Sequence, residues 1–151
     1  MRIEFRSLIE ERLTWPVRAV PLGGGGHKGH FLPDNVRAAR YRTNTGTWGI
    51  PQTIQAVNDD ASDPQLAVDS RGNVIVLWSQ NKSDGTSSGV IWSNRYRAHA
   101  GAWGRARIVQ SQNGIARTPQ VAITPIANTA TAVWSQASDS GTYAIWAGSY
   151  R

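Results

Sequence analysis

The chain has 151 residues, enough for one domain of ordinary size, and its sixteen Lys and Arg against ten Asp and Glu give a formal net charge of +6. Seven Trp, 15 Gly and 7 Pro within a 40% hydrophobic composition exclude a disordered basic tail and argue against a helical bundle. The absence of cysteine excludes disulfides, thiol catalysis and Cys-ligated metal centres, and no apolar stretch approaches the roughly 20 residues of a membrane helix, so we expect no membrane partner.

The first segment, residues 1–39, does not take part in the repeat described below. Residues 2–13 place four apolar side chains at helical spacing, which predicts a short amphipathic helix. The four glycines at 23–26 predict a flexible linker, and no Lys-Ser/Thr follows them as in a phosphate-binding loop, so we expect no nucleotide cofactor. His27 and His30 have no third ligand nearby, so we expect no metal there.

From residue 40 onward the sequence repeats with a period of about 55 residues, the kind of self-similarity that decides a fold prediction. Three blocks recur in the same order: 63–68 as 118–123, 76–80 as 132–136, and 91–97 as 145–151. A partial third copy lies upstream, where residues 40–42 and 46–49 match 95–97 and 101–104. The insertions and deletions fall between the blocks, in predicted turns, where a structural repeat tolerates them.

Each repeat unit contains four segments with the pattern of short β-strands. In the most complete unit they are residues 64–68, 74–80, 90–97 and 103–110. Residues 74–78 form a continuous apolar run, which is typical of a strand buried on both faces. Four antiparallel strands in about 55 residues, with Trp on three of them, are typical of a β-propeller blade. We therefore predict an all-β fold of propeller-type blades.

The repeat begins and ends out of phase with the predicted blade. Residues 40–56 supply the end of a third strand and a whole fourth strand, residues 57–111 a complete blade, and residues 112–151 the first three strands of the next. The chain thus holds two blades' worth of strands. The strand missing at the end is present near the start, as in propellers that close their ring with a blade built from both termini.

The repeated residues resemble those of bacterial sialidase-like β-propeller proteins. The shared pattern is Pro-Gln-hydrophobic-Ala, Asp-x-x-Gly-Asn, a run ending in Trp-Ser-Gln, Ile-Trp-x-x-x-Tyr-Arg, and Gly-x-Trp-Gly, and it covers residues 40–151. The Asp box of sialidases, Ser-x-Asp-x-Gly-x-Thr-Trp, would fall at residues 43–48 and 99–103. Neither segment has its Asp, and both shorten the spacing from Gly to Trp. The resemblance therefore extends to the repeat, and only weakly to the sialidase enzymes.

Two blades cannot close a ring, and alone they would expose apolar sheet faces and unpaired edges. Some small bacterial propeller lectins resolve this by joining two-blade chains with cyclic symmetry. The sequence therefore predicts a homo-oligomer, a trimer of six blades, in which residues 47–55 of one copy pair with 145–151 of the next. The alternative is that the chain is a fragment of a longer propeller.

Glycans are the ligands that the aromatic residues suggest, because an aromatic face stacks on a sugar ring while neighbouring Arg, Asn and Gln bind its hydroxyls. Trp78 and Trp134 are predicted to be core instead, since burying a Trp removes roughly 150–250 Å² from water. For Trp48 and Trp103 both roles stay open. The candidate ligand-binding residues lie on or beside the repeated strands: Trp92, Trp146, Gln80, Gln136, Arg95 and Arg97.

A sialidase-type reaction needs an Arg cluster, a Tyr nucleophile activated by Glu, and an Asp acid/base. Arg and Tyr are present in the repeats, but the glutamates are Glu4, Glu10 and Glu11, all before the repeat. We therefore predict a non-enzymatic protein with no catalytic residue. A truncated or vestigial sialidase-like glycoside hydrolase, or a structural repeat fragment without a ligand, are the alternatives.

Metal and nucleic-acid partners are not expected. Asp59, Asp60 and Asp63 could offer oxygen ligands to Ca²⁺, but the second repeat retains no carboxylate in that turn. Residues 43–151 carry eight basic and six acidic side chains, a difference of only +2, which does not indicate a groove that follows a phosphate backbone.

Overall fold

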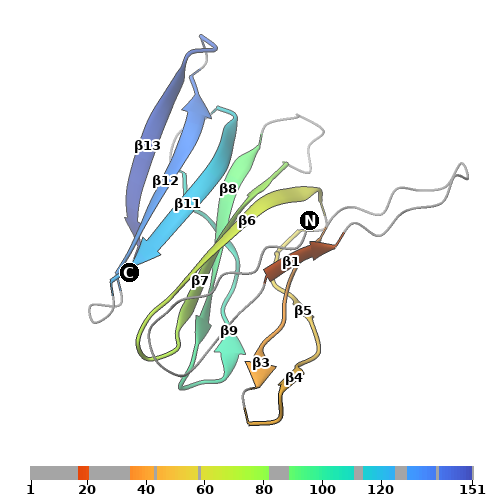
Figure 1. Cartoon of the computed structure of the whole chain (residues 1–151). Helices are drawn as coiled ribbons and strands as arrows, with labels where there is room; N and C mark the ends of the chain where they lie inside the picture. Colours follow the sequence, from red (N-terminus) through yellow and green to blue (C-terminus); the bar gives the residue numbers. More distant parts are fainter. Residues whose placement is uncertain are drawn as a thin grey trace, which may run out of the picture.

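The computed structural model describes residues 17–20, 35–42, 44–57, 59–81, 89–110, 114–124, 129–138 and 140–150. Within these ranges the chain is all-β, with antiparallel strands and no helix (Figure 1). The predicted helix over residues 2–13, the glycine run and the two linker histidines lie outside the described residues.

The strands form three successive sheets (Figure 1). The first sheet is β1 (Val17–Val20), β2 (Asn35–Ala38) and β5 (Gln52–Thr53), and the two-stranded ladder β3 (Tyr41–Arg42) and β4 (Thr47–Trp48) continues it along the chain. The middle sheet is β6 (Ala61–Val68), β7 (Val74–Gln80) and β8 (Val90–Arg97), with β9 (Ala102–Trp103) and β10 (Arg107–Ile108) both paired to β8. The last sheet is β11 (Ala116–Ile123), β12 (Ala130–Ala137) and β13 (Tyr143–Tyr150).

Strand pairing repeats with the period of the sequence. Ala38 pairs with Gln52 in the first sheet, and 55 residues later Ser93 pairs with Arg107 in the middle sheet. In the same way, Trp78 pairs with Trp92 in the middle sheet and Trp134 with Trp146 in the last. The sequence repeat is therefore a structural repeat.

A β-bulge marks the same point of β6 and β11. The register shifts between Ser62 and Gln65 in one strand and between Arg117 and Gln120 in the other. The residue before the proline, Asp63 or Thr118, has a φ of 51° in both strands. Non-glycine residues seldom adopt this left-handed conformation, and a bulge is where an extra residue is accommodated. The shared bulge is further evidence of the repeat.

The core lies between consecutive sheets. One cluster joins the first and middle sheets and includes Val36, Ile54 and Trp78. A second joins the middle and last sheets and includes Leu77, Ile91 and Trp134. Because the middle sheet packs on both faces, every residue of β7 is buried, as its continuous apolar run predicts. The prediction that the two repeated tryptophans of the second strands are core residues is confirmed, with Trp78 at 0% and Trp134 at 5% exposure.

The first sheet begins earlier than the repeated residues indicate. β2 starts at Asn35, and β3 begins at Tyr41, so two short strands take the position of the third strand in this unit. β1 pairs with β2 as β7 pairs with β8. These two strands lie within residues 1–39, the segment that the sequence set apart from the repeat.

Residues 47–53 find their partners within their own chain. Thr47 and Trp48 pair with β3, and Gln52 and Thr53 pair with β2. Within one chain the segment therefore pairs with β2 and β3, which take the place that the predicted trimer gives to a neighbouring copy's last sheet. The trimer itself stays a prediction.

Candidate ligand groove

Two of the predicted ligand-binding residues, Gln80 and Gln136, are buried and already hydrogen-bonded. The Nε1 of Trp78 donates to Gln80 Oε1 at 2.8 Å, and the Nε1 of Trp134 donates to Gln136 Oε1 at 2.9 Å. Gln80 Nε2 also donates to the carbonyl oxygens of Val57 at 2.8 Å and Asp59 at 3.2 Å. In both repeats the glutamine side chain therefore accepts the indole N–H hydrogen bond of a core tryptophan. Both glutamines lie inside the protein rather than in a ligand site.

The predicted pair Trp92 and Trp146 occupies equivalent positions in two different sheets. Trp92 is half-buried on β8 and packs against the core between the first and middle sheets. Its buried Nε1 has no hydrogen-bond partner among the residues described. Trp146 is 39% exposed on β13. The structure does not bring these two rings into one site.

Arg95 and Arg97, the remaining predicted residues, lie near the end of β8. Arg95 is half-buried, its backbone nitrogen donates to Asn94 Oδ1 at 2.6 Å, and its carbonyl oxygen accepts from Gly104 N at 2.8 Å. Arg97 is exposed. Both therefore lie close to the turn between β8 and β9, and neither lines the groove described next.

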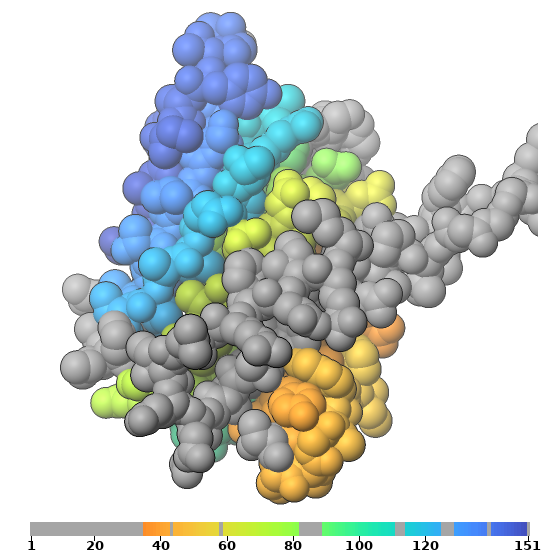
Figure 2. Space-filling model, in the orientation of Figure 1, coloured from red at the N-terminus to blue at the C-terminus, as the bar shows by residue number. Residues whose placement is uncertain are grey.

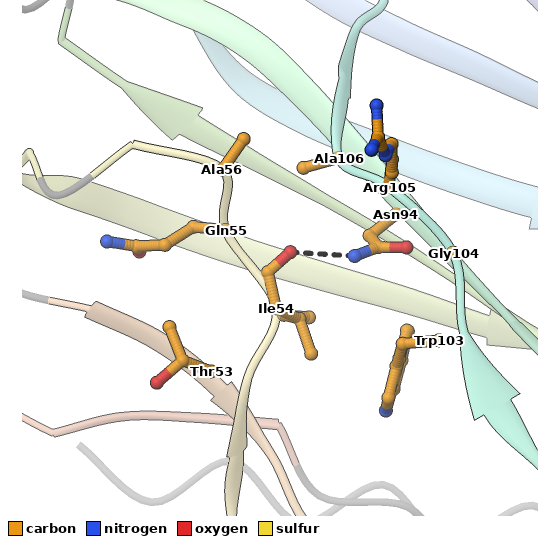
Figure 3. Close-up of a pocket in the computed structure, with 9 residues that line it drawn as sticks. All are labelled: Thr53, Ile54, Gln55, Ala56, Asn94, Trp103, Gly104, Arg105 and Ala106. Atoms are coloured by element: carbon orange, nitrogen blue, oxygen red, sulfur yellow. Dashed lines mark hydrogen bonds between the residues drawn. The ribbon is translucent and has the colours of Figure 1, made fainter.

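A groove of about 490 Å³ lies between the first and middle sheets. Residues 53–56, which run on from β5, form one wall, and residues 103–106, which link β9 to β10, form the other (Figure 3). Asn94 of β8 joins the walls, because its Nδ2 donates to the carbonyl oxygen of Ile54 at 2.7 Å. The groove therefore belongs to the contact between two repeat units, and it has the size of a small-molecule site.

The walls combine an aromatic ring with exposed polar side chains. Trp103 is half-buried, and Tyr96 supports it with ring centroids 5.5 Å apart and an interplanar angle of 59°. Thr53 and Arg105 are exposed at the two walls, and they offer a hydroxyl and a guanidinium to a ligand. A ligand with an apolar face and a polar edge would match this arrangement.

Gln55 and Asn94 are polar lining residues whose bonds are directed mainly at the protein. Gln55 Oε1 accepts from the backbone nitrogen of Val36 at 2.7 Å, and its Nε2 donates to Asn35 Oδ1. The same role recurs 55 residues later, where Gln110 Oε1 accepts from Ile91 N at 3.0 Å. These amides shape the groove, while Thr53 and Arg105 are its exposed side chains with a hydroxyl and a guanidinium group.

Most residues of the groove are not among those that the sequence predicts to bind a ligand. For Trp103 the sequence leaves both the core and the ligand role open, and it does not mark Thr53, Gln55, Asn94 or Arg105. One signal is present: Asn94 interrupts the apolar pattern of its strand, while the equivalent residues in the other units are Ala39 and Gly148. No sequence pattern shows that Asn94 meets Ile54, 40 residues away.

The part of the chain that the structure describes offers no candidate metal site and no candidate membrane helix. No group of three or more His, Asp or Glu side chains gathers there as a metal site would require. Asp59 instead accepts from the backbone nitrogen of Asp60 at 2.9 Å within its turn. No helix in this part of the chain is long and apolar enough to cross a membrane.

The chain matches no protein-family model, no curated protein and no solved structure.

Proposed function

We propose that this protein is a non-enzymatic repeat protein of the β-propeller type, similar to sialidase-like propellers, and that it binds carbohydrate in the groove between its first two sheets. The observation that carries the proposal is that Trp103 and the exposed Arg105 belong to the same wall of the groove, residues 103–106, opposite the wall of residues 53–56. A sugar ring has an apolar face that packs on an aromatic ring and hydroxyls that accept hydrogen bonds from a guanidinium.

The chemistry of the groove favours binding over hydrolysis. Glycosidases use a pair of carboxyl groups that flank the scissile bond, and none of the nine residues that line the groove is Asp or Glu. Arg105 gives the rim a positive charge, which favours neutral sugars or sugars that carry a carboxylate over amino sugars.

The repeat supports the propeller part of the proposal. Successive sheets pack face to face, pair with the same register and carry the same bulge. The middle sheet has the four-strand path of a blade, with β6 at one side and the interrupted strand β9–β10 at the other. In this reading the groove is an inter-blade site.

The test is a glycan array with the purified, labelled chain, followed by calorimetric titration of the best ligand. We expect Arg105→Ala to weaken binding at least about tenfold, the loss typical of removing a charged hydrogen-bond donor, about 1.5–3 kcal/mol. Trp103→Ala is expected to do the same, and Trp103→Phe to retain part of the affinity because it keeps an aromatic face.

Two matched controls separate the groove from general effects. Arg107 is an exposed arginine two residues beyond the groove arginine, and Trp48 occupies the position of Trp103 in the first ladder. Arg107→Ala and Trp48→Ala should leave the affinity within about twofold of the wild type, well below the energy of one hydrogen bond. A flat array, or equal losses in the groove variants and the controls, would refute the proposed site.

A further inference from the structure

The first repeat unit exposes two large apolar side chains at its tip. Ile50 is 89% exposed, the highest value for a large apolar side chain among the residues that the structure describes, and Trp48 is 48% exposed. Gly49 lies between them, and its backbone nitrogen donates to the carbonyl oxygen of Arg40 at 2.7 Å, so it continues the ladder of β3 and β4. Side chains alternate along such a ladder, which places Trp48 and Ile50 on the same side. Figures 1 and 2 show β3 and β4 at the lower tip of the molecule.

Two exposed arginines accompany these apolar side chains. Arg42 is exposed on β3, the partner strand of β4. Arg37 is exposed on β2, and its Nη2 donates to the carbonyl oxygen of Pro51, the residue after Ile50, at 3.3 Å. An arginine keeps its charged end in a polar layer while its apolar stem lies along an apolar surface. We call the four exposed residues Arg37, Arg42, Trp48 and Ile50 the tip patch.

The strands around the tip patch carry positive charge without negative charge. The described parts of residues 35–57 and 89–110, which include β2 to β5 and β8 to β10, hold seven Arg and no Asp or Glu. The two segments meet where Arg40 Nη1 donates to Tyr96 Oη at 3.4 Å. The remaining described residues after position 58 hold four Asp and two Arg. The small net charge of the repeats therefore conceals a separation of charge, and this basic part of the molecule attracts an anionic partner.

A partner for the tip patch must be anionic and must also receive apolar side chains. A second copy of the chain would bring arginines against arginines. Nucleic acids and acidic glycans match the charge, but their charged backbones are hydrated and offer little to an aliphatic side chain such as Ile50. A phospholipid surface offers both, because acidic headgroups attract Lys and Arg, and Trp is enriched at the boundary between headgroups and hydrocarbon.

We propose that the tip patch binds the surface of an anionic membrane, with Trp48 and Ile50 at the boundary of the hydrocarbon and Arg37 and Arg42 among the headgroups. The expectation of no membrane partner rested on the absence of a spanning segment, which a surface contact does not need. The proposal does not depend on the glycan groove, whose aromatic side chain is Trp103.

The size of the tip patch sets the strength of the contact. Each arginine close to an anionic lipid surface strengthens binding about fivefold, and two apolar side chains add a small inserted area. The contact is therefore weak and reversible, and salt weakens it because its charges are exposed to solvent. Neutral lipid lacks the electrostatic part, so we expect it to bind the chain much less.

Co-sedimentation of the full chain with lipid vesicles tests the proposal. Vesicles of phosphatidylcholine mixed with phosphatidylserine provide the anionic surface, and vesicles of phosphatidylcholine alone are the neutral comparison. We expect binding to the mixed vesicles, and Ile50→Ser should lower the binding constant at least about fivefold, because it removes an apolar side chain from the contact. The control is Ile145→Ser, which changes an isoleucine that is 78% exposed on β13 of the last sheet and should leave binding at the wild-type level.

A matched pair of charge reversals tests the arginines. Arg42 belongs to the tip patch, and Arg117 is an exposed arginine on β11 of the last sheet. Arg42→Glu and Arg117→Glu change the net charge by the same amount. Arg42→Glu should lower the binding constant for the mixed vesicles at least about tenfold, since it removes one charge and adds a repelling one, whereas Arg117→Glu should lower it much less.

Quenching of tryptophan fluorescence by brominated lipids shows which side chain meets the membrane. Brominated acyl chains quench a tryptophan only when its ring reaches the hydrocarbon boundary. We expect quenching of the wild type by mixed vesicles, and loss of most of it in Trp48→Phe, which keeps an aromatic ring in the contact. Trp146→Phe is the control, because Trp146 is also exposed, at 39%, but lies on β13. Far-UV circular dichroism checks that each variant is folded.

Four results would overturn the proposal. They are a wild type that does not bind the mixed vesicles, a wild type that binds neutral vesicles equally well, equal effects in either matched pair of variants, and quenching that Trp48→Phe leaves unchanged. Binding that depends on the arginines but not on Ile50 or Trp48 would indicate a soluble polyanion as the partner instead. None of these results bears on glycan binding, so the two proposals fail independently.

Discussion

Replacing Gln80 by Leu separates a structural role from a ligand-binding one. The change deletes three hydrogen bonds: from Trp78 Nε1, and to the carbonyl oxygens of Val57 and Asp59. Trp78 is fully buried, so its indole N–H would lose its partner with no water to replace it, at about 1–3 kcal/mol. The two carbonyls lie on half-buried residues and can regain water, so each adds about 0.5 kcal/mol.

The expected loss in the free energy of unfolding is therefore about 2–4 kcal/mol, a large share of the stability of a small domain. Urea denaturation followed by circular dichroism measures it, with Gln52→Leu as the control because Gln52 is exposed. A double-mutant cycle with Trp78→Phe should recover about 1 kcal/mol, since the partner N–H is then removed as well.

Two results would refute this reasoning. One is a stability change of less than about 0.5 kcal/mol for Gln80→Leu, the level of an ordinary surface substitution. The other is a loss of glycan affinity in this variant while its stability stays at the wild-type level. The second result would return Gln80 to the ligand site that the sequence suggested.

Two further substitutions test the local structure in the same denaturation assay. Gly114 has a φ of +124°, and a Cβ there would lie 2.0 Å from the carbonyl oxygen of Ala137, so Gly114→Ala should lower the free energy of unfolding by more than about 3 kcal/mol. Gly141 has a φ of +80° and open space around it, so Gly141→Ala should lower it by only about 1–2 kcal/mol. Equal losses in the two variants would contradict the close approach at Gly114. Asp69→Ala removes a buried carboxylate that accepts from the backbone nitrogens of Arg71 and Asn73 at 2.9 Å and from Asn73 Nδ2 at 2.7 Å, so it should cost about 2–3 kcal/mol, and a loss below about 0.5 kcal/mol would show that the turn does not depend on it.

The sequence located most of the middle and last sheets. Their strands are marked by apolar runs and repeated tryptophans, and the predicted ranges 74–80 and 90–97 coincide with β7 and β8. The predicted fourth strand, 103–110, is instead the two short strands β9 and β10, separated by residues 104–106. Next to them, the backbone nitrogens of Gly104 and Val109 still donate to the carbonyl oxygens of Arg95 and Ile91 on β8.

The start of the first sheet and the groove could not be found in this way. β2 carries Val36 and Arg37 where the other third strands carry Ile-Trp. The residues of β2 therefore do not indicate the repeat, although the backbone pairing of β2 is the same as that of β8. The groove depends on the bond from Asn94 to Ile54, and it forms only once two units pack together. Repetition shows which residues share a strand position, but not which side chains of neighbouring units meet.

Cross-strand nuclear Overhauser effects between assigned backbone protons test the repeat of paired sheets most directly. The structure predicts contacts between Ala38 and Gln52 and, 55 residues later, between Ser93 and Arg107. Contacts from residues 47–53 to β13, in place of those to β2 and β3, would contradict the account.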